Sequence, residues 1–153
     1  MTSRTHPVRI LMADDDPDDQ MLTREALAES QLAIDLECVE DGEELINYLR
    51  DCVRSARRRN FSLPDLILLD LNMPKKDGRE ALLEIKSDPD LMRIPVVVLT
   101  TSHVEEDILR SYNLGVSGFI VKPVTLEQQV QVMQTLVQYW FQVVEMPYES
   151  SRV

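Results

Sequence analysis

The sequence contains little glycine and little cysteine. Its 153 residues include four glycines and two cysteines. Neither G-x-G-x-x-G nor G-x-x-x-x-G-K-[ST] occurs, so the chain lacks the glycine-rich loops with which dinucleotide-binding and P-loop proteins hold phosphates. Cys38 and Cys52 do not form a C-x-x-C pair, and we expect both to be reduced thiols without a disulfide or redox role.

Positive charge and long apolar runs are also scarce. The 16 Lys and Arg residues face 27 Asp and Glu residues, which gives a formal net charge of −11. This balance argues against binding to nucleic acid or to an anionic membrane surface, because both require an excess of cationic side chains. No apolar run approaches the ~18 residues that a membrane-spanning helix needs, and the N-terminus has no apolar signal core. We therefore expect a cytoplasmic protein with no DNA and no membrane partner.

Two kinds of segment alternate along the chain. Apolar runs rich in β-branched residues occupy 8–13, 34–39, 66–70, 95–100 and 118–121. Apolar residues recur at helical spacing in 17–30, 42–53, 79–87 and 104–113, and a last helix is expected to begin at Thr125. This pattern predicts one α/β domain with a parallel sheet covered by helices on both faces. Ligands of such sheets bind beyond the carboxyl ends of the strands.

Polar side chains follow the ends of the expected strands. They are Asp14 and Asp15 after the first strand, Asp70 at the end of the third, Thr100 at the end of the fourth and Lys122 after the fifth. Three carboxylates in one place suit Mg²⁺, which prefers hard oxygen ligands. A lysine and a hydroxyl beside them are consistent with a carboxylate that accepts a phosphoryl group, because the negative charge on the transferred group must be neutralised.

The other acids near the first strand have a structural explanation. The stretch ADDDPDD, at 13–19, holds five carboxylates in seven residues. Asp16 precedes Pro17, as expected of an N-cap followed by proline at the first helical position. Asp18 and Asp19 fall in the first helical turn, where the helix dipole favours negative charge. We therefore expect none of these three acids to bind metal.

Four short motifs stand at the strand ends. They are the pair Asp14-Asp15, LLDLNMPKKDG around Asp70, VVLTTS around Thr100 and FIVKP ending in Lys122-Pro123. With these motifs in this order, the chain resembles the receiver domain of two-component response regulators. The resemblance implies a flavodoxin-like (βα)5 fold, a doubly wound parallel sheet with strand order 2-1-3-4-5. It covers residues 8–140, which leaves 1–7 as an N-terminal tail and 141–153 as a C-terminal extension.

The resemblance also implies roles for the acids. Asp70 would accept a phosphoryl group from a phosphohistidine of a sensor histidine kinase. The side chains of Asp15 and Asp70 would bind Mg²⁺, with the backbone carbonyl of Asn72. Asp14 would hold a metal-bound water. Lys122 would pair with the acceptor carboxylate and then with the phosphoryl group.

Two further residues would carry the signal. Thr100 would hydrogen-bond the phosphoryl oxygen and move inward. Phe119 falls at the aromatic switch position, where it would couple Thr100 to the face formed by the fourth helix, the fifth strand and the fifth helix. The Lys122–Pro123 peptide bond would be cis, as X-Pro bonds permit at modest cost.

A narrower resemblance concerns the partner. The stretch from DGREALLEIK to GFIVKPV, the arginine-rich run before LPDLILLD and the ending YWFQVVEMP resemble the single-domain response regulators that are paired with cyanobacterial and bacterial phytochromes. This resemblance implies a phytochrome histidine kinase as the partner. It also agrees with a homodimer, because phytochrome-type regulators are dimers.

The last helix carries two apolar faces. One face consists of Leu126, Val130, Met133 and Val137, and the other of Val132, Leu136, Tyr139, Trp140 and Val143. A surface helix needs one such face to join its own core, and a second indicates an interaction surface. We expect a homodimer through this helix, and the alternative is that residues 141–153 fold back over the second face.

Two other functions remain as alternatives. A metal-dependent phosphatase with an aspartate nucleophile would need a second acid nearby for its leaving group. The residue two positions beyond Asp70 is Asn72, which cannot act as a general acid. A receiver-like binding module that is never phosphorylated is disfavoured by the complete set of site residues. The stretch 141–153 is too short for an output domain. We therefore expect a signalling protein that acts through protein contacts and is not an enzyme beyond its own phosphorylation and dephosphorylation.

Overall fold

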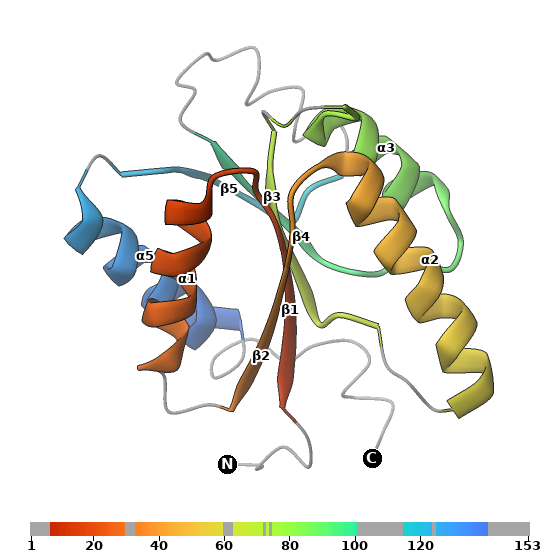
Figure 1. The fold of residues 1–153 in the computed structure, drawn as a ribbon, viewed down its shortest axis with the longest axis horizontal. Coiled ribbons are helices and arrows are strands. Elements are labelled where there is room, and N and C mark those ends of the chain that lie inside the picture. The colour runs from red at the N-terminus through yellow and green to blue at the C-terminus, as the bar shows by residue number, and fades with distance from the viewer. Residues whose placement is uncertain are drawn as a thin grey trace.

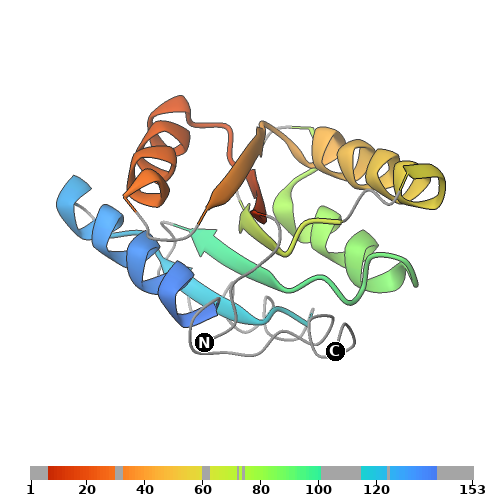
Figure 2. The same cartoon turned by 90° about the horizontal axis from the view of Figure 1, so that it is seen from below.

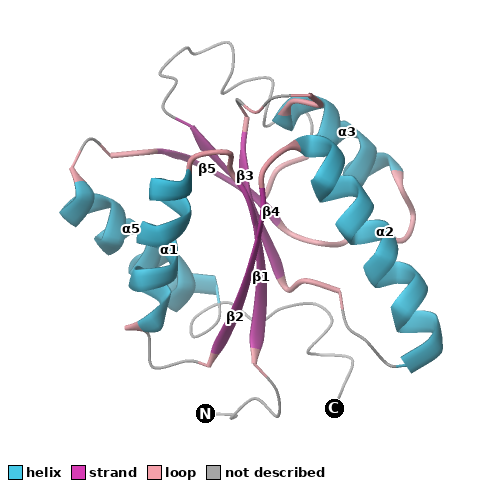
Figure 3. Cartoon of the chain, viewed as in Figure 1, coloured by secondary structure: helices cyan, strands magenta, loops and turns pink. Residues whose placement is uncertain are grey.

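The structure is a computed structural model that describes residues 7–29, 33–59, 63–71, 73, 75–100, 115–123 and 125–140. The side chains of 56–59 and of Thr100 lie outside this description. Figures 1 and 3 show the elements, which in chain order are β1 (Val8–Ala13), α1 (Pro17–Ala28), β2 (Ile34–Val39), α2 (Gly42–Arg59), β3 (Leu66–Asp70), α3 (Gly78–Ser87), β4 (Val96–Thr100), β5 (Gly118–Val121) and α5 (Leu126–Gln138).

The five strands form one sheet in the order β2-β1-β3-β4-β5. All four neighbouring pairs are parallel, with Ala13 of β1 opposite Leu69 of β3 and Asp70 of β3 opposite Leu99 of β4. The expected α/β fold and strand order are confirmed. The carboxyl ends of β1 and β3 are therefore neighbours at one edge of the sheet.

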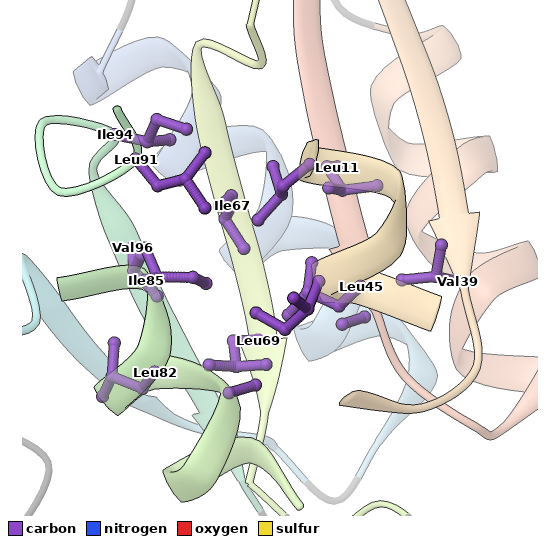
Figure 4. Packing of buried hydrophobic residues seen from close by; sticks show 14 of the residues in the cluster. Leu11, Val39, Leu45, Ile67, Leu69, Leu82, Ile85, Leu91, Ile94 and Val96 are labelled. Carbon is purple, nitrogen blue, oxygen red and sulfur yellow. The ribbon is translucent and has the colours of Figure 1, made fainter. Parts of the chain in front are cut away.

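Helices cover both faces of the sheet. The helices α1 and α5 lie on one side and α2 and α3 on the other, as the two views in Figures 1 and 2 show. Alternate residues of a strand point to opposite faces. Leu11, Ile67 and Leu69 accordingly join the core under α2 and α3, part of which Figure 4 shows. Met12 and Leu68 join the second core under α1 and α5.

The central strand β3 is buried on both faces. Every residue of Leu66–Asp70 is buried, as expected of a continuous apolar run in a parallel sheet. Asp70 is the polar exception, and it stands at the last position of the strand. The apolar strand thus ends with a carboxylate at the edge of the molecule where ligands of such sheets bind.

A glycine allows α3 to begin directly against the end of β3. The N–H of Gly78 donates to the carbonyl oxygen of Leu71 at 3.0 Å. A Cβ atom at Gly78 would lie 2.4 Å from the carbonyl oxygen of Asp70, too close for any other residue to fit without a shift. Asp77 caps the same helix, because its side chain accepts the N–H of Glu80 at 3.0 Å. The segment after Asp70 is therefore held tightly to the strand.

Most element boundaries lie within two residues of the expected ones, one end differs by more, and one expected helix lies outside the description. The helix α2 was expected over 42–53 but continues to Arg59, because arginine and alanine are good helix formers and neither glycine nor proline interrupts 54–59. The expected helix over 104–113 lies outside the described residues. No helix in the described part of the chain is long and apolar enough to cross a membrane.

Candidate functional site

Three acids converge at the carboxyl ends of β1 and β3. One carboxylate oxygen from each of Asp14, Asp15 and Asp70 lies within 4.8 Å of the others. Asp14 is 1% exposed and Asp70 is 9% exposed, whereas Asp15 is exposed to solvent. The pairing of β1 with β3 brings these acids together, although the two strands are far apart in the sequence.

This cluster fits a hydrated divalent cation. The donor set consists of carboxylate oxygens, which are the hard ligands that Mg²⁺ and similar ions prefer. One of the three acids is open to solvent, so an ion could enter with some of its water. A second feature holds Asp14 in place, because its Oδ1 accepts the N–H of Asp16 at 2.9 Å.

Lys122 brings one ammonium group into contact with three carboxylates. Its Nζ donates to Oδ2 of Asp14 at 2.7 Å, to Oδ2 of Asp19 at 2.7 Å and to Oδ2 of Asp70 at 3.1 Å. An ammonium group has three N–H donors, and the three carboxylates match that number. The side chain of Lys122 is only 10% exposed, so its charge is buried and paired.

Burial changes the proton affinity of both partners. Burial raises the pKa of Asp14 to about 6, although the hydrogen bond from Lys122 opposes the rise. Burial alone would lower the pKa of Lys122, but its hydrogen bonds to Asp14 and Asp19 outweigh burial and raise it. Lys122 therefore keeps its positive charge at neutral pH. Three acids, Asp14, Asp19 and Asp70, share this one ammonium group.

Two glutamines hold the turns that carry these groups. Nε2 of Gln20, on α1, donates to the backbone carbonyl of Asp14 at 2.6 Å. Nε2 of Gln129, on α5, donates to the backbone carbonyl of Pro123 at 3.0 Å. The turn after β1 and the turn after β5 are thus each tied to the helix that follows.

The structure brings together four of the residues that the sequence indicated, namely Asp14, Asp15, Asp70 and Lys122. Thr100 ends β4 opposite Val121, but its side chain lies outside the described residues. Asn72 also lies outside them.

Phe119 and Pro123 are the other positions with expected roles. Phe119 lies on β5 opposite Val98 and is partly buried against the core under α2 and α3. The described residues contain no cis peptide bond. The expected cis form of the Lys122–Pro123 bond is therefore wrong for this structure, which has the trans form that X-Pro bonds generally prefer.

The sequence did not lead us to expect the contact between Asp19 and Lys122. We expected Asp18 and Asp19 to act alike at the start of α1, but only Asp19 reaches Lys122. Asp18 is exposed. The helical repeat held a signal, since Asp19 stands four residues before Thr23 and seven before Ala26, and both are buried. That spacing places Asp19 on the face of α1 that turns toward the sheet.

Comparisons with known proteins agree with this geometry. The chain matches the response regulator receiver domain family over residues 10–134. The response regulator Rcp1 of Synechocystis sp. is 40% identical over 148 residues, a match that covers 96% of this chain and 99% of that protein.

Two solved structures are similar over nearly their whole length. The phosphorylated cyanobacterial phytochrome response regulator RcpA is 46% identical, with a TM-score of 0.85, and the match covers 93% of this chain and 99% of that one. The Mn²⁺-bound form of Rcp1 is 42% identical, with a TM-score of 0.82, and the match covers 92% of this chain and 99% of that one.

Proposed function

Because the chain belongs to the response regulator receiver domain family, we propose that it accepts a phosphoryl group on Asp70. A carboxylate oxygen of Asp70 attacks the phosphorus of a phosphohistidine. The N–P bond breaks, and its electron pair stays on the imidazole of the donor. The product is a mixed anhydride of Asp70 and phosphate. The observation that carries this proposal is the contact of the Lys122 ammonium with Asp70 inside the acid cluster.

We also propose that Mg²⁺ is the cation that supports this reaction. The side chains of Asp15 and Asp70 would hold it, with Asp14 acting through a water and Asn72 through its backbone carbonyl. A bound cation supplies positive charge to the phosphoryl oxygens. The carboxylate donor set and the Mn²⁺-bound form of the related Rcp1 support a divalent cation at this site.

Lys122 has a role that its own contacts support. Its ammonium lies 3.1 Å from Oδ2 of Asp70 and keeps its charge. Once Asp70 carries the phosphoryl group, the same ammonium would pair with a phosphoryl oxygen. The hydroxyl group of Thr100, at the end of the neighbouring strand β4, would donate a hydrogen bond to another phosphoryl oxygen. Phe119 on β5 would respond to the movement of Thr100.

The partner that we propose is a sensor histidine kinase, in particular a phytochrome. RcpA is a phytochrome response regulator, and its likeness to this chain supports that choice. The negative net charge of −11 argues against a DNA or anionic membrane partner, and we propose a cytoplasmic location. We propose that residues 8–140 form the receiver domain, between a tail at 1–7 and an extension at 141–153.

We further propose that two copies associate through α5. The two expected apolar faces of this helix are less separate than the sequence indicated, because Leu136 is buried and Val132 and Trp140 pack against the core. Tyr139 remains 54% exposed. It borders a groove of about 590 Å³ between β5 and α5, to which Ile120 and Val132 also contribute. This apolar groove beside an exposed aromatic ring supports an interface here.

The alternative functions are not favoured. A phosphatase and an unphosphorylated binding module both remain poorer explanations, because the relatives that cover nearly the whole chain are response regulators and one of them is phosphorylated. The family consists of signalling modules, and we propose no small-molecule substrate.

Labelling with a phosphoryl donor tests this function. The purified protein is mixed with Mg²⁺ and an acyl phosphate, and its intact mass is followed. We expect the mass of one phosphoryl group to appear, and not to appear when EDTA removes the metal before the acyl phosphate is added. The isosteric Asp70→Asn variant should stay unlabelled, because an amide is too weak a nucleophile. Labelling of that variant at the normal rate would refute Asp70 as the acceptor.

A further inference from the structure

Asp19 differs from the other two carboxylates that contact Lys122. The cluster that could hold a cation consists of Asp14, Asp15 and Asp70 among the residues that the structure describes. Asp14 and Asp70 therefore serve both the cluster and Lys122. Asp19 contacts Lys122 at 2.7 Å without belonging to that cluster. Among the three carboxylates that the ammonium contacts, Asp19 is the one outside the cluster.

The surroundings strengthen the pair of Asp19 and Lys122. The side chain of Asp19 is 19% exposed and that of Lys122 is 10% exposed. Both border a small cavity of about 20 Å³ between α1, β5 and α5, which is lined mainly by apolar side chains such as Met12, Leu22 and Ile120. Water screens a charge pair poorly in such a place, so its attraction is greater than at an open surface.

The helix dipole does not explain this arrangement. A carboxylate in the first turn of a helix is stabilised whichever way its side chain turns. Asp18 stands in the same turn of α1 and is exposed, whereas Asp19 turns toward the sheet and meets a lysine 103 positions away in the sequence. The position of Asp19 thus matches a role toward Lys122.

We propose that Asp19 positions Lys122 for phosphoryl transfer by holding its ammonium in place while Asp14 and Asp70 are engaged by the cation. This inference rests on the proposed function of Asp70. A lysine side chain has many rotamers, and ordering it during the reaction costs free energy. If Asp19 holds the ammonium beforehand, the charge is already in place when negative charge develops on the transferred group.

The three N–H groups of Lys122 make this role compatible with the reaction. The donor that points to Asp70 in this structure is free to turn to a phosphoryl oxygen on Asp70. The donor that points to Asp19 keeps its partner. Asp19 therefore does not compete with the phosphoryl group but limits where the ammonium can be.

The test compares Asp19→Asn with the matched control Asp18→Asn. Both variants remove one negative charge from the first turn of α1 without changing side-chain size. The rate of Asp70 labelling by an acyl phosphate is measured at saturating Mg²⁺, and the Kd of Mg²⁺ is measured separately by titration calorimetry. NMR of ¹⁵N-lysine-labelled protein gives the exchange rate of the Lys122 Nζ hydrogens with water.

We expect Asp19→Asn to slow labelling about tenfold, the order of magnitude of one hydrogen bond between charged groups. The Kd of Mg²⁺ should remain that of the wild type, and the Nζ hydrogens should exchange faster. Asp18→Asn should match the wild type in all three measurements. Equal labelling rates in the two variants would overturn the proposal, as would a loss of Mg²⁺ affinity that accounts for the slower rate. Failure of the wild type itself to become labelled would instead refute the proposed function.

Discussion

At the scale of single residues, the acids that follow β1 divide according to the direction that each one faces. Asp14 and Asp15 lie in the cluster with Asp70. Asp16 caps α1, because its side chain accepts the N–H of Asp18 at 2.9 Å. Asp19 turns inward to Lys122. The run of like charges is thus divided among the cluster, a helix cap and Lys122, whose positive charge Asp14 and Asp19 share.

This division predicts unequal effects on metal binding. Asp15→Ala should weaken Mg²⁺ binding severely, because it removes a carboxylate of the cluster. Asp18→Ala should change Mg²⁺ binding little and should lower the free energy of unfolding by only ~0.3–1 kcal/mol, the usual value for a charge at a helix N-terminus. Titration calorimetry of the two variants gives the comparison. Similar losses of affinity in both would show that the acids act as one diffuse patch.

Local patterns made most of these residue assignments predictable. Strand ends and helix caps involve neighbours in the sequence, so Asp14, Asp15 and Asp16 could be assigned from it. The contact of Asp19 with Lys122 spans 103 positions, and no local pattern reveals such a partner. The helical repeat could show that Asp19 faces inward but not what it meets there.

At the scale of the elements, the junction between β3 and α3 controls the position of Asp70. The carbonyl oxygen of Asp70 lies only 2.4 Å from the position that a Cβ atom at Gly78 would take. The start of α3 is also tied to the strand by the bond from the N–H of Gly78 to Leu71. Any movement of this helix would therefore move the acceptor.

Gly78→Ala tests this junction. The new methyl group would lie 2.4 Å from the Asp70 carbonyl oxygen, so we expect a loss of ~1–3 kcal/mol in the free energy of unfolding, as overpacking commonly causes. Labelling of Asp70 should slow as well. The control is Gly118→Ala, whose methyl group would meet Val97 at an ordinary 3.6 Å. Denaturant titrations and labelling rates that match between the two variants would contradict this account.

Element types were predictable for a physical reason. The continuous apolar run of β3 reflects burial of that strand on both faces. The helical spacing of apolar residues in α3 reflects burial of one face of that helix. The end of α2 was predicted too early, at residue 53, although the residues of 54–59 favour a helix.

At the scale of the whole molecule, the alternation of segments predicts a parallel sheet but not the order of its strands. Strand order depends on contacts between distant segments, and here it was expected from the family resemblance. The structure confirms the order β2-β1-β3-β4-β5. This order places β1 beside β3, and thereby Asp14 beside Asp70.

The proposed dimer is also a property of the whole molecule. Tyr139→Asp should shift the protein from dimer to monomer, because it places a charge in the proposed interface, where it would be desolvated. Light scattering coupled to size-exclusion chromatography measures the mass. Leu83→Asp is the control, since Leu83 is 55% exposed on α3, which covers the opposite face of the sheet. A wild-type monomer, or a dimer that survives Tyr139→Asp, would exclude this interface.

Locating the phosphoryl group on the chain identifies the acceptor residue. After transfer from an acyl phosphate in the presence of Mg²⁺, borohydride reduces an aspartyl phosphate to homoserine, and peptide mass spectrometry identifies the position. We predict homoserine at position 70 and unmodified aspartate at positions 14, 15 and 19. Reduction at any of those three positions, or no reduced residue in labelled protein, would contradict the assignment of Asp70 as the phosphoryl acceptor.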